Sequence, residues 1–360
     1  MNPAHSESAH SESAHSESAH SESAHRQPAS RTRAKPLATL SIDLDDQWAY
    51  LRAAGVDAWA AAPSYLDVAV PRLVDTLGPL NLPLSVFLVG RDLEFDHTRA
   101  AISRLAELRE VEYGNHSWNH LPWLHTMNPS EIHDEVARTH QAIVSETGQI
   151  PVGFRGPGFS CPDSVLGEIA NQGYRYDASS FPTSMAPVAR LVFLLRSDLR
   201  GAEREKAKKL YGGFSSMFRP NRPHRRQQGD HAMWELPVTT LPMLRTPIHF
   251  SYLLFLASKS VWLAKAYFTT ALRLCRTLNT VPSLLLHPPD FLGAQDQTLL
   301  THLPGMRWAR EKKLSVVRWA LEKLAESFDV WTLRRYVQFA AGGDQGGSGP
   351  GSLAPVQASV

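Results

Sequence analysis

The chain has 360 residues, with 37 Lys and Arg against 35 Asp and Glu, so its formal net charge is only +2. A general nucleic-acid binder would carry a strong basic excess, so this balance argues against a nucleic-acid partner. Two cysteines, Cys161 and Cys275, are too few for a disulfide framework or a cysteine metal cluster. They favour a reducing, cytoplasmic setting.

The first residues repeat the pentapeptide His-Ser-Glu-Ser-Ala over 5–24 and continue as a basic stretch over 26–35. This segment has almost nothing to bury, so residues 1–36 are predicted to be a disordered tail. Metal delivery by the evenly spaced histidines is an alternative, but a flexible chain fixes no ligand geometry. A second tail, rich in Gly, Ser and Pro, is predicted over 341–360, which leaves 37–340 as the folded domain.

Short apolar runs alternate with helical patterns along this domain. Strands are predicted over 37–42, 84–89, 111–115, 152–155, 174–176 and 283–286. The clearest helix is predicted over 129–146, with Asn128 as N-cap, Glu131 completing the capping box and Gly148 ending the helix. Such alternation indicates a parallel sheet, either open or closed into a barrel. The longest apolar stretch, 248–275, is interrupted by basic residues, so no transmembrane span is expected.

Polar residues follow the carboxyl ends of these predicted strands. They are Asp43, Asp45, His116, His120, Arg155, Asp177 and His287. All carboxyl ends of a parallel sheet or barrel open on one face, where catalytic groups collect. Two histidines and one carboxylate suit a divalent metal with an open coordination position, and the second carboxylate is then left to act as a base.

Each of these residues also has a structural interpretation. Histidines in H-x-x-x-H spacing are often structural, and the acids after the first strand could form a turn, with Asp46 the best helix cap among them. His287 lies between a leucine run and two prolines and could be a buried, hydrogen-bonded histidine. Arg155 could be an ordinary loop arginine, and Asp177 could cap the next segment.

Taken together, these motifs resemble those of the polysaccharide deacetylases, the NodB-homology or family 4 carbohydrate esterase group. The family's acidic motif after the first strand reads S-I-D-L-D-D at 41–46, which is spaced rather than adjacent. This D-x-D form is similar to the branch that contains peptidoglycan-deacetylase-like proteins and lipid-linked formamido-arabinose deformylases. The second motif is matched by H-S-W-N-H at 116–120.

Three further motifs extend the resemblance. The arginine motif is matched by R-G-P-G at 155–158, and the leucine-rich strand that ends in histidine is matched by L-L-H at 285–287. Asp177 is the candidate for the fourth motif, without the tryptophan that often follows it. The resemblance covers 37–177 and the region around His287.

The resemblance implies that Asp45, His116 and His120 bind a divalent cation. The family's usual metal is zinc, with cobalt or nickel also used, and two histidines with one carboxylate suit zinc as well as other transition metals. The metal would polarise the substrate carbonyl and bring the pKa of a bound water to about 7.

The resemblance also implies roles for the remaining residues. Asp43 would take the proton of the water, with Arg155 holding this carboxylate ionised and oriented. The backbone N–H at Gly158 would meet the oxyanion together with the metal, and His287 would protonate the leaving amine. Asp177 completes the catalytic set. The two carboxylates of the D-x-D pair could exchange roles.

The fold implied is the distorted (β/α)7 barrel of the NodB-homology type. The activity implied is metal-dependent hydrolysis of an N-acyl group, acetyl or formyl, on an amino sugar of a glycan or lipid-linked saccharide. An amidohydrolase for a small nonsugar amide and a sugar-binding pseudoenzyme are the alternatives. The joint presence of candidate base, ligands and acid speaks against a pure binder.

A basic insertion at 185–230 lies between the fifth and the last of these strands. The segment 190–226 contains eleven lysines and arginines but only three acids, and an apolar, aromatic run follows at 248–256. One interpretation is a solvated insertion followed by ordinary core helices. The other is a lid that meets an anionic, lipid-linked sugar, with peripheral contact at the inner membrane face.

Overall fold

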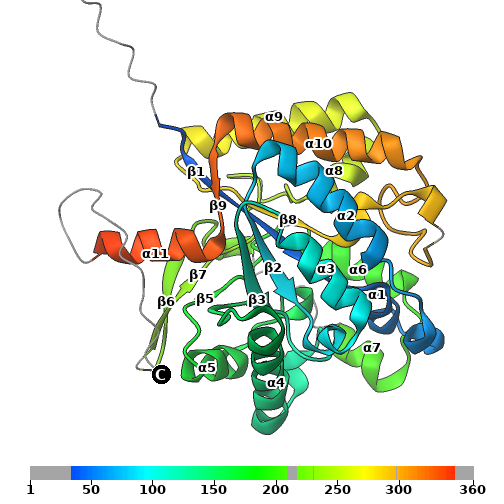
Figure 1. The fold of residues 1–360 in the computed structure, drawn as a ribbon, viewed down its shortest axis with the longest axis vertical. Helices are drawn as coiled ribbons and strands as arrows, with labels where there is room; N and C mark the ends of the chain where they lie inside the picture. The colour runs from blue at the N-terminus through cyan, green and yellow to red at the C-terminus, as the bar shows by residue number, and fades with distance from the viewer. Residues whose placement is uncertain (1–33, 209–216, 230, 297, 345–360) are drawn as a thin grey trace, which may run out of the picture. The chain divides into compact units, whose positions relative to one another are not determined.

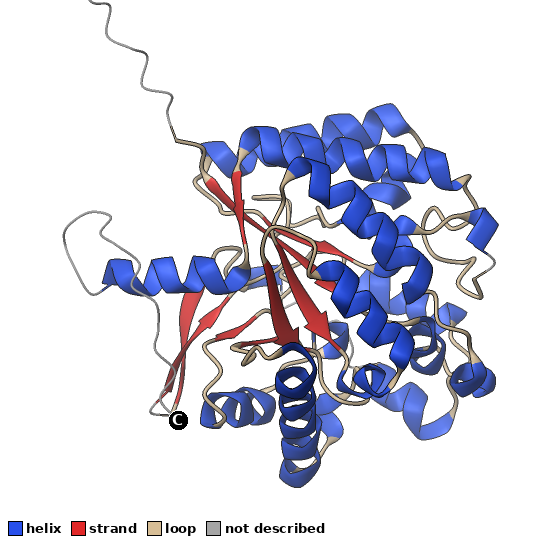
Figure 2. Ribbon diagram, in the orientation of Figure 1, coloured by secondary structure: helices blue, strands red, loops and turns tan. Residues whose placement is uncertain are grey.

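A sheet of mainly parallel strands lies among the helices of the domain (Figure 2). The computed structural model describes residues 34–208, 217–229, 231–296 and 298–344. Contacts divide the chain into Met1–Ala34 and Lys35–Val360, and the fold is that of the second unit. Residues 1–33 of the predicted tail, which include the His-Ser-Glu-Ser-Ala repeats, and the end of the chain from 345 on lie outside the described residues.

Seven parallel strands follow one another across the sheet in the order β7, β5, β4, β3, β2, β1, β8. The strands are β1 (Leu37–Asp43), β2 (Leu84–Leu88), β3 (Val111–Asn115), β4 (Gly153–Phe154), β5 (Tyr176–Asp177), β7 (His231–Glu235) and β8 (Ser283–Leu286). An antiparallel strand, β6 (His224–Gln228), flanks β7, and β9 (Asp329–Trp331) also pairs with β1. The predicted distorted (β/α)7 barrel is confirmed.

The parallel part of the sheet ends at β7 and β8, and the segment that follows β7 bridges the gap to β8. The backbone N–H of Val238 donates to the carbonyl of Ser180, which follows β5, at 2.8 Å. The backbone N–H of Thr239 donates to the carbonyl of Ser283 in β8 at 3.0 Å. The Ser283 N–H returns a bond to the Thr239 hydroxyl at 2.8 Å. These bonds close the barrel where strand pairing stops, which accounts for its distortion.

Helices surround the sheet (Figure 1). They are α1 (Gln47–Ala53), α2 (Leu66–Leu77), α3 (Asp96–Leu105), α4 (Pro129–Thr147), α5 (Asp163–Asn171), α6 (Ala186–Arg196), α7 (Gly201–Ala207), α8 (Phe250–Ala257), α9 (Val261–Thr277), α10 (Arg310–Ser327) and α11 (Leu333–Asp344). The predicted helix over 129–146 is α4, which has the expected capping box between Asn128 and Glu131 and ends at Gly148 in the left-handed region. The last helix, α11, runs past residue 340, the expected end of the domain.

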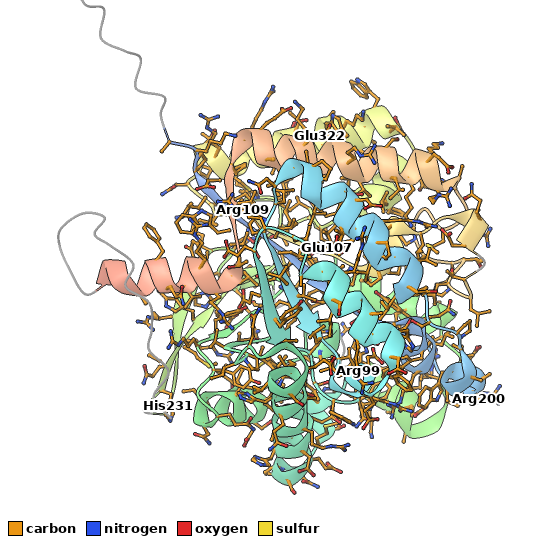
Figure 3. The ribbon with its side chains drawn as sticks, in the orientation of Figure 1. Arg99, Glu107, Arg109, Arg200, His231 and Glu322 are labelled. Atoms are coloured by element: carbon orange, nitrogen blue, oxygen red, sulfur yellow. The ribbon has the colours of Figure 1, made fainter. Side chains whose placement is uncertain are left out.

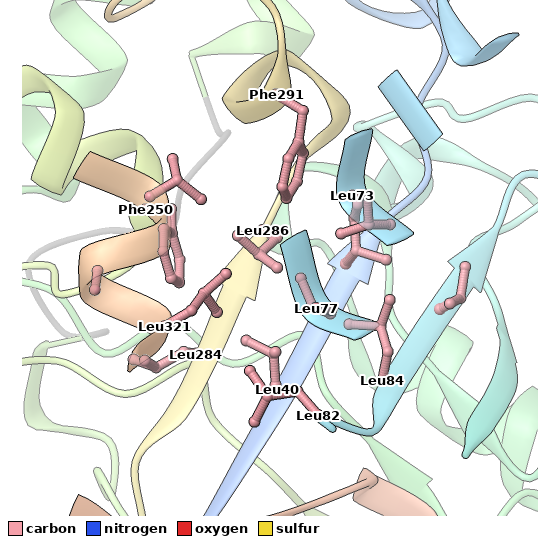
Figure 4. Packing of buried hydrophobic residues seen from close by; sticks show 14 of the residues in the cluster. Leu40, Leu73, Leu77, Leu82, Leu84, Phe250, Leu284, Leu286, Phe291 and Leu321 are labelled. Atoms are coloured by element: carbon pink, nitrogen blue, oxygen red, sulfur yellow. The ribbon is translucent and has the colours of Figure 1, made fainter. Parts of the chain in front are cut away.

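The main core lies between β1 and β8 on one side and the helices that cover them on the other. Leu40 of β1 and Leu286 of β8 are fully buried with Leu77 of α2, Phe250 of α8 and Leu321 of α10 (Figure 4). Burying each such side chain contributes about 1.5–3 kcal/mol. Because β1 and β8 end in acidic and histidine residues, this packing also fixes where two parts of the site lie.

The described part of the basic insertion, 185–230, forms α6, α7 and β6, and β6 pairs with the following strand β7 in a hairpin that the sequence did not predict. Residues 209–216 lie outside the described residues. Exposed charges such as Arg99 and Arg200 project from the ribbon (Figure 3). Among the described residues, no helix is both long and apolar enough to cross a membrane.

Candidate active site

The three predicted metal ligands lie together at the carboxyl ends of β1 and β3. Asp45 Oδ1 is 3.3 Å from His116 Nε2 and 3.2 Å from His120 Nε2. Zinc with ligand bonds of about 2.0–2.1 Å in a tetrahedron requires ligand atoms about 3.3–3.4 Å apart. Asp45 Oδ1 is buried and has no hydrogen-bond partner among the described residues. The spacing and this unpaired oxygen therefore fit a tetrahedral divalent metal.

The electrostatics of this trio favour a carboxylate facing two imidazoles. Burial alone raises the pKa of Asp45, but the neighbouring imidazoles of His120 and His116 hold that pKa well below its usual range. Burial alone lowers the pKa of His116, but Asp43 and Asp45 raise it above its ordinary value. A divalent cation would supply the positive charge that the carboxylates attract here.

A backbone carbonyl sets the orientation of His116. Its Nδ1 lies 2.6 Å from the carbonyl oxygen of Arg155, so Nδ1 carries the proton and donates it to that oxygen. The lone pair of Nε2 is then left facing Asp45. Metal-binding histidines are commonly fixed in this way by a bond from the other ring nitrogen.

Asp43 lies between the trio and His287. Arg155 Nη1 donates to Asp43 Oδ1 at 2.6 Å, and Asp43 Oδ2 is 3.9 Å from both His116 Nε2 and His287 Nε2. Arg155 is fully buried, donates through Nε to the Ala178 carbonyl at 3.0 Å and stacks on Phe87 at 4.2 Å. This guanidinium is held rigidly and fixes one oxygen of the carboxylate while the other faces the site.

His287 follows β8 at the mouth of the site. Its side chain is 18% exposed, against 6% for Asp43, so a substrate can reach the imidazole. Its backbone N–H donates to Asp290 at 2.8 Å, and the buried Lys313 of α10 donates to the Pro289 carbonyl at 2.6 Å. Burial raises the pKa of Asp290 and lowers that of Lys313 to about 8. These two residues, which the sequence analysis did not identify, hold the loop that begins at His287.

Asp177 lies at the end of β5, but its contacts are local. Its Oδ1 accepts the backbone N–H and the hydroxyl of Ser179, and that hydroxyl in turn accepts the N–H of Gly156 at 2.8 Å. Burial and the neighbouring Glu235 raise the pKa of Asp177 to about 6. These bonds support the loop that carries Arg155, and a direct catalytic role for Asp177 stays a prediction.

The loop after β4 presents the candidate oxyanion donor. Gly158 has φ +59°, and a Cβ there would lie 3.0 Å from Pro122 Cβ, so both the backbone and the space favour glycine. The backbone bonds of this turn come from Phe159 and Ser160, and neither uses the Gly158 N–H. Its role as oxyanion donor stays a prediction.

An aromatic group borders this loop. Phe159 packs on Phe181 with ring centroids 4.8 Å apart, and Phe181 packs on His249 at 5.4 Å. Burial and the charge of nearby His287 lower the pKa of His249 to about 3, so this second imidazole is neutral. His249 lies just before α8, in an apolar run that gave no sign of a site in the sequence.

The fold and the site together define an α/β barrel with a two-histidine, one-carboxylate cluster at its strand ends. The family model described as Polysaccharide deacetylase matches residues 57–176, a segment that contains His116, His120 and Arg155. Over this segment, a third of its length, the chain matches the polysaccharide deacetylase family, and the resemblance recognised from the motifs is confirmed. Asp43, Asp45 and His287 lie outside the matched segment.

Individual proteins of this family also resemble the chain. The peptidoglycan-N-acetylglucosamine deacetylase PgdA of Listeria monocytogenes is 28% identical over 99 residues, which cover 28% of this chain and only 20% of PgdA. A Mycobacterium smegmatis structure assigned to the polysaccharide deacetylases covers 92% of this chain and 98% of its own, with a TM-score of 0.55 and 17% identity. At that identity the likeness establishes the fold alone.

Proposed function

We propose that this protein is a metal-dependent hydrolase that removes an N-acyl group, acetyl or formyl, from an amino sugar. The observation that carries the proposal is the arrangement around Asp43. One oxygen of this carboxylate is fixed by Arg155, and the other is 3.9 Å from both a candidate ligand, His116, and a candidate acid, His287. Base, ligands and acid thus meet at one point, as hydrolysis of an amide requires.

A divalent metal held by Asp45, His116 and His120 would polarise the acyl carbonyl and lower the pKa of a water molecule. We propose zinc, since two imidazoles and one carboxylate suit it, with cobalt or nickel able to replace it.

The chain's own groups would carry the protons. Asp43 takes a proton from the attacking water, whose oxygen bonds to the acyl carbon. The Gly158 N–H donates to the oxyanion that forms, and His287 gives a proton to the amine nitrogen as the C–N bond breaks. The free amine and the carboxylic acid leave, and proton exchange with solvent restores both residues.

The substrate class is proposed from the relative and the site together. PgdA acts on peptidoglycan N-acetylglucosamine according to its name, and the partly exposed Phe159 and Phe181 offer rings on which a sugar face could stack. A glycan or a lipid-linked saccharide is therefore the proposed substrate, and a small nonsugar amide is the alternative.

Acetate and formate release tests this proposal. Zinc-loaded protein incubated with N-acetylglucosamine oligomers and N-formyl amino sugars is expected to release acid and expose a free amine. Equal kcat/KM on acetamide-like small amides would favour the alternative substrate class. Saturable binding of the oligomers without any release would indicate a pseudoenzyme and refute the hydrolase.

We also propose a peripheral membrane contact, but through α6 rather than through the basic residues of the insertion. Arg222 donates to the Leu278 carbonyl, Arg225 stacks on Trp234, and Arg226 pairs with Glu235 and Asp163. All three arginines thus already bind groups of the protein, and we do not propose them as the membrane contact. The cytoplasmic setting stays a prediction.

An apolar stripe on α6 supports the membrane contact. Four exposed side chains at helical spacing form it, Val188, Leu191, Val192 and Leu195, and the last of these is 72% exposed. The neighbouring loop, bonded through the carbonyls of Leu244 and Arg245 to Ser184, presents Met243 at 82% exposure. Such exposed apolar side chains suit the headgroup boundary of a bilayer.

A further inference from the structure

The loop that carries both histidine ligands has an unfavourable backbone. Ser117 has φ +63° and His120 has φ +51°, in the left-handed region that non-glycine residues rarely adopt. Such a residue persists only where its surroundings determine its conformation. Something outside the loop must therefore hold it.

The carboxylate of Glu135 contacts the middle of this loop. Its Oε2 accepts the backbone N–H of Trp118 at 2.9 Å and that of Asn119 at 2.8 Å, and its Oε1 accepts the Asn119 side-chain amide at 2.6 Å. Glu135 is only 6% exposed. Hydrogen bonds to an ionised carboxylate are about twice as strong as neutral ones, so three of them form a firm attachment.

The attachment joins the loop to a rigid helix. Glu135 lies in the middle of α4, on the side of Ile132 and Thr139, which are buried. Arg138, one turn further along α4, stacks on the Trp118 ring at 4.0 Å. From the other side, the N–H groups of Gly90 and Arg91 donate to the carbonyls of Ser117 and Trp118.

We propose that Glu135 is a positioning residue of the metal centre. By accepting the two N–H groups between His116 and His120, it holds both imidazoles at their ligand spacing before any metal binds. Without it, metal binding would have to order the loop and overcome its backbone strain. This inference rests on the proposed metal site.

The substitution Glu135→Gln tests this role with little change of volume. Its amide oxygen can still accept bonds, but its NH2 group would meet the NH2 of Asn119. We expect zinc affinity of the apoprotein, measured by competition with a chromophoric chelator, to fall 10–100-fold, the usual effect of removing a partner that orients ligands. We also expect faster hydrogen exchange at the Trp118 and Asn119 amides in the metal-free protein.

Glu131→Gln is the matched control. It lies one turn earlier on α4, and its carboxylate accepts the Asn128 N–H at 2.8 Å as part of the helix cap. We expect it to reduce the melting temperature but to leave zinc affinity within twofold of the unmodified protein. Asn119→Ala, which removes one bond of the three, should lie between the two variants in affinity.

Equal zinc affinity in the two glutamine variants, with unchanged exchange at Trp118 and Asn119, would overturn the inference. If Glu135→Gln does not fold, Asn119→Ala with full wild-type affinity and exchange would overturn it instead. Should the unmodified protein bind no zinc, cobalt or nickel, the proposed metal site fails. The exchange measurement would still decide whether Glu135 holds the loop.

Discussion

The two carboxylates of the D-x-D pair are expected to respond differently to the same change. Asp45 faces two imidazole nitrogens at 3.2 and 3.3 Å, whereas Asp43 is bonded to Arg155 at 2.6 Å and lies 3.9 Å from the nearest of those nitrogens. Replacing each with asparagine keeps the shape and removes the charge. Asp45→Asn should therefore impair metal binding, and Asp43→Asn should impair proton transfer.

The magnitudes follow from these contacts. Zinc sites with four protein ligands are worth about 10–16 kcal/mol, so one ligand accounts for roughly 3–4 kcal/mol, or a 10²–10³-fold loss of affinity in Asp45→Asn. Asp43→Asn should bind zinc within severalfold of the unmodified protein but lose about 10²–10⁴-fold in kcat, the contribution of a positioned base. It also leaves the fully buried Arg155 without its charged partner, at a cost of about 3–5 kcal/mol in unfolding free energy.

Three measurements separate the two roles. Chelator competition gives zinc affinity, acetate release at saturating zinc gives kcat, and urea unfolding shows that each variant is folded under assay conditions. If Asp43→Asn loses zinc while Asp45→Asn keeps it, the roles are exchanged. If both variants lose zinc to the same extent, both carboxylates are ligands and Asp43 cannot be a free base.

Further outcomes concern the acid, a buried histidine and the membrane surface. His287→Ala should lower kcat at least tenfold and remove the alkaline limb of the pH profile, because a protonated imidazole is needed to expel the amine; an unchanged profile would make His287 structural. Since the pKa of His249 falls from 6.5 to about 3 on folding, the unfolded state binds more protons in that window. The unfolding free energy of the apoprotein should therefore fall as pH drops from 6.5 toward 3, by up to about 1.4 kcal/mol per pH unit, and less steeply in His249→Phe; equal slopes in urea titrations would contradict this. The double variant Leu191→Ser, Leu195→Ser should reduce sedimentation with anionic vesicles at least threefold. The control Ile150→Ser, which changes a similarly exposed apolar side chain away from α6, should not reduce it. Unchanged vesicle binding in both variants would show that α6 is not the contact.

Much of the fold could be predicted from the sequence because its signals are local. The buried runs of β1 to β3 and β8 and the cap of α4 depend on residues a few positions apart, and the structure has them where expected. The hairpin β6–β7 was missed because its sequence, HRRQQ followed by HAMWE, lacks an apolar alternation. It pairs at the edge of the sheet, where its strands do not need two buried faces.

The candidate ligands, base and acid could also be identified from the sequence, because each directly follows a strand and parallel strands bring their ends together. What the sequence could not give is the full set of groups that orient them. The family resemblance placed Arg155 beside Asp43, a contact that spans 112 positions, but nothing in the sequence indicated that Glu135 meets the histidine loop from the middle of a helix whose pattern showed only an apolar stripe. Such contacts depend on how helices pack on the sheet, and no spacing along the chain encodes that packing. Tertiary structure alone therefore decided that Glu135 contacts the histidine loop, that Asp290 and Lys313 hold the loop after His287, and that Asp177 supports the loop that carries Arg155.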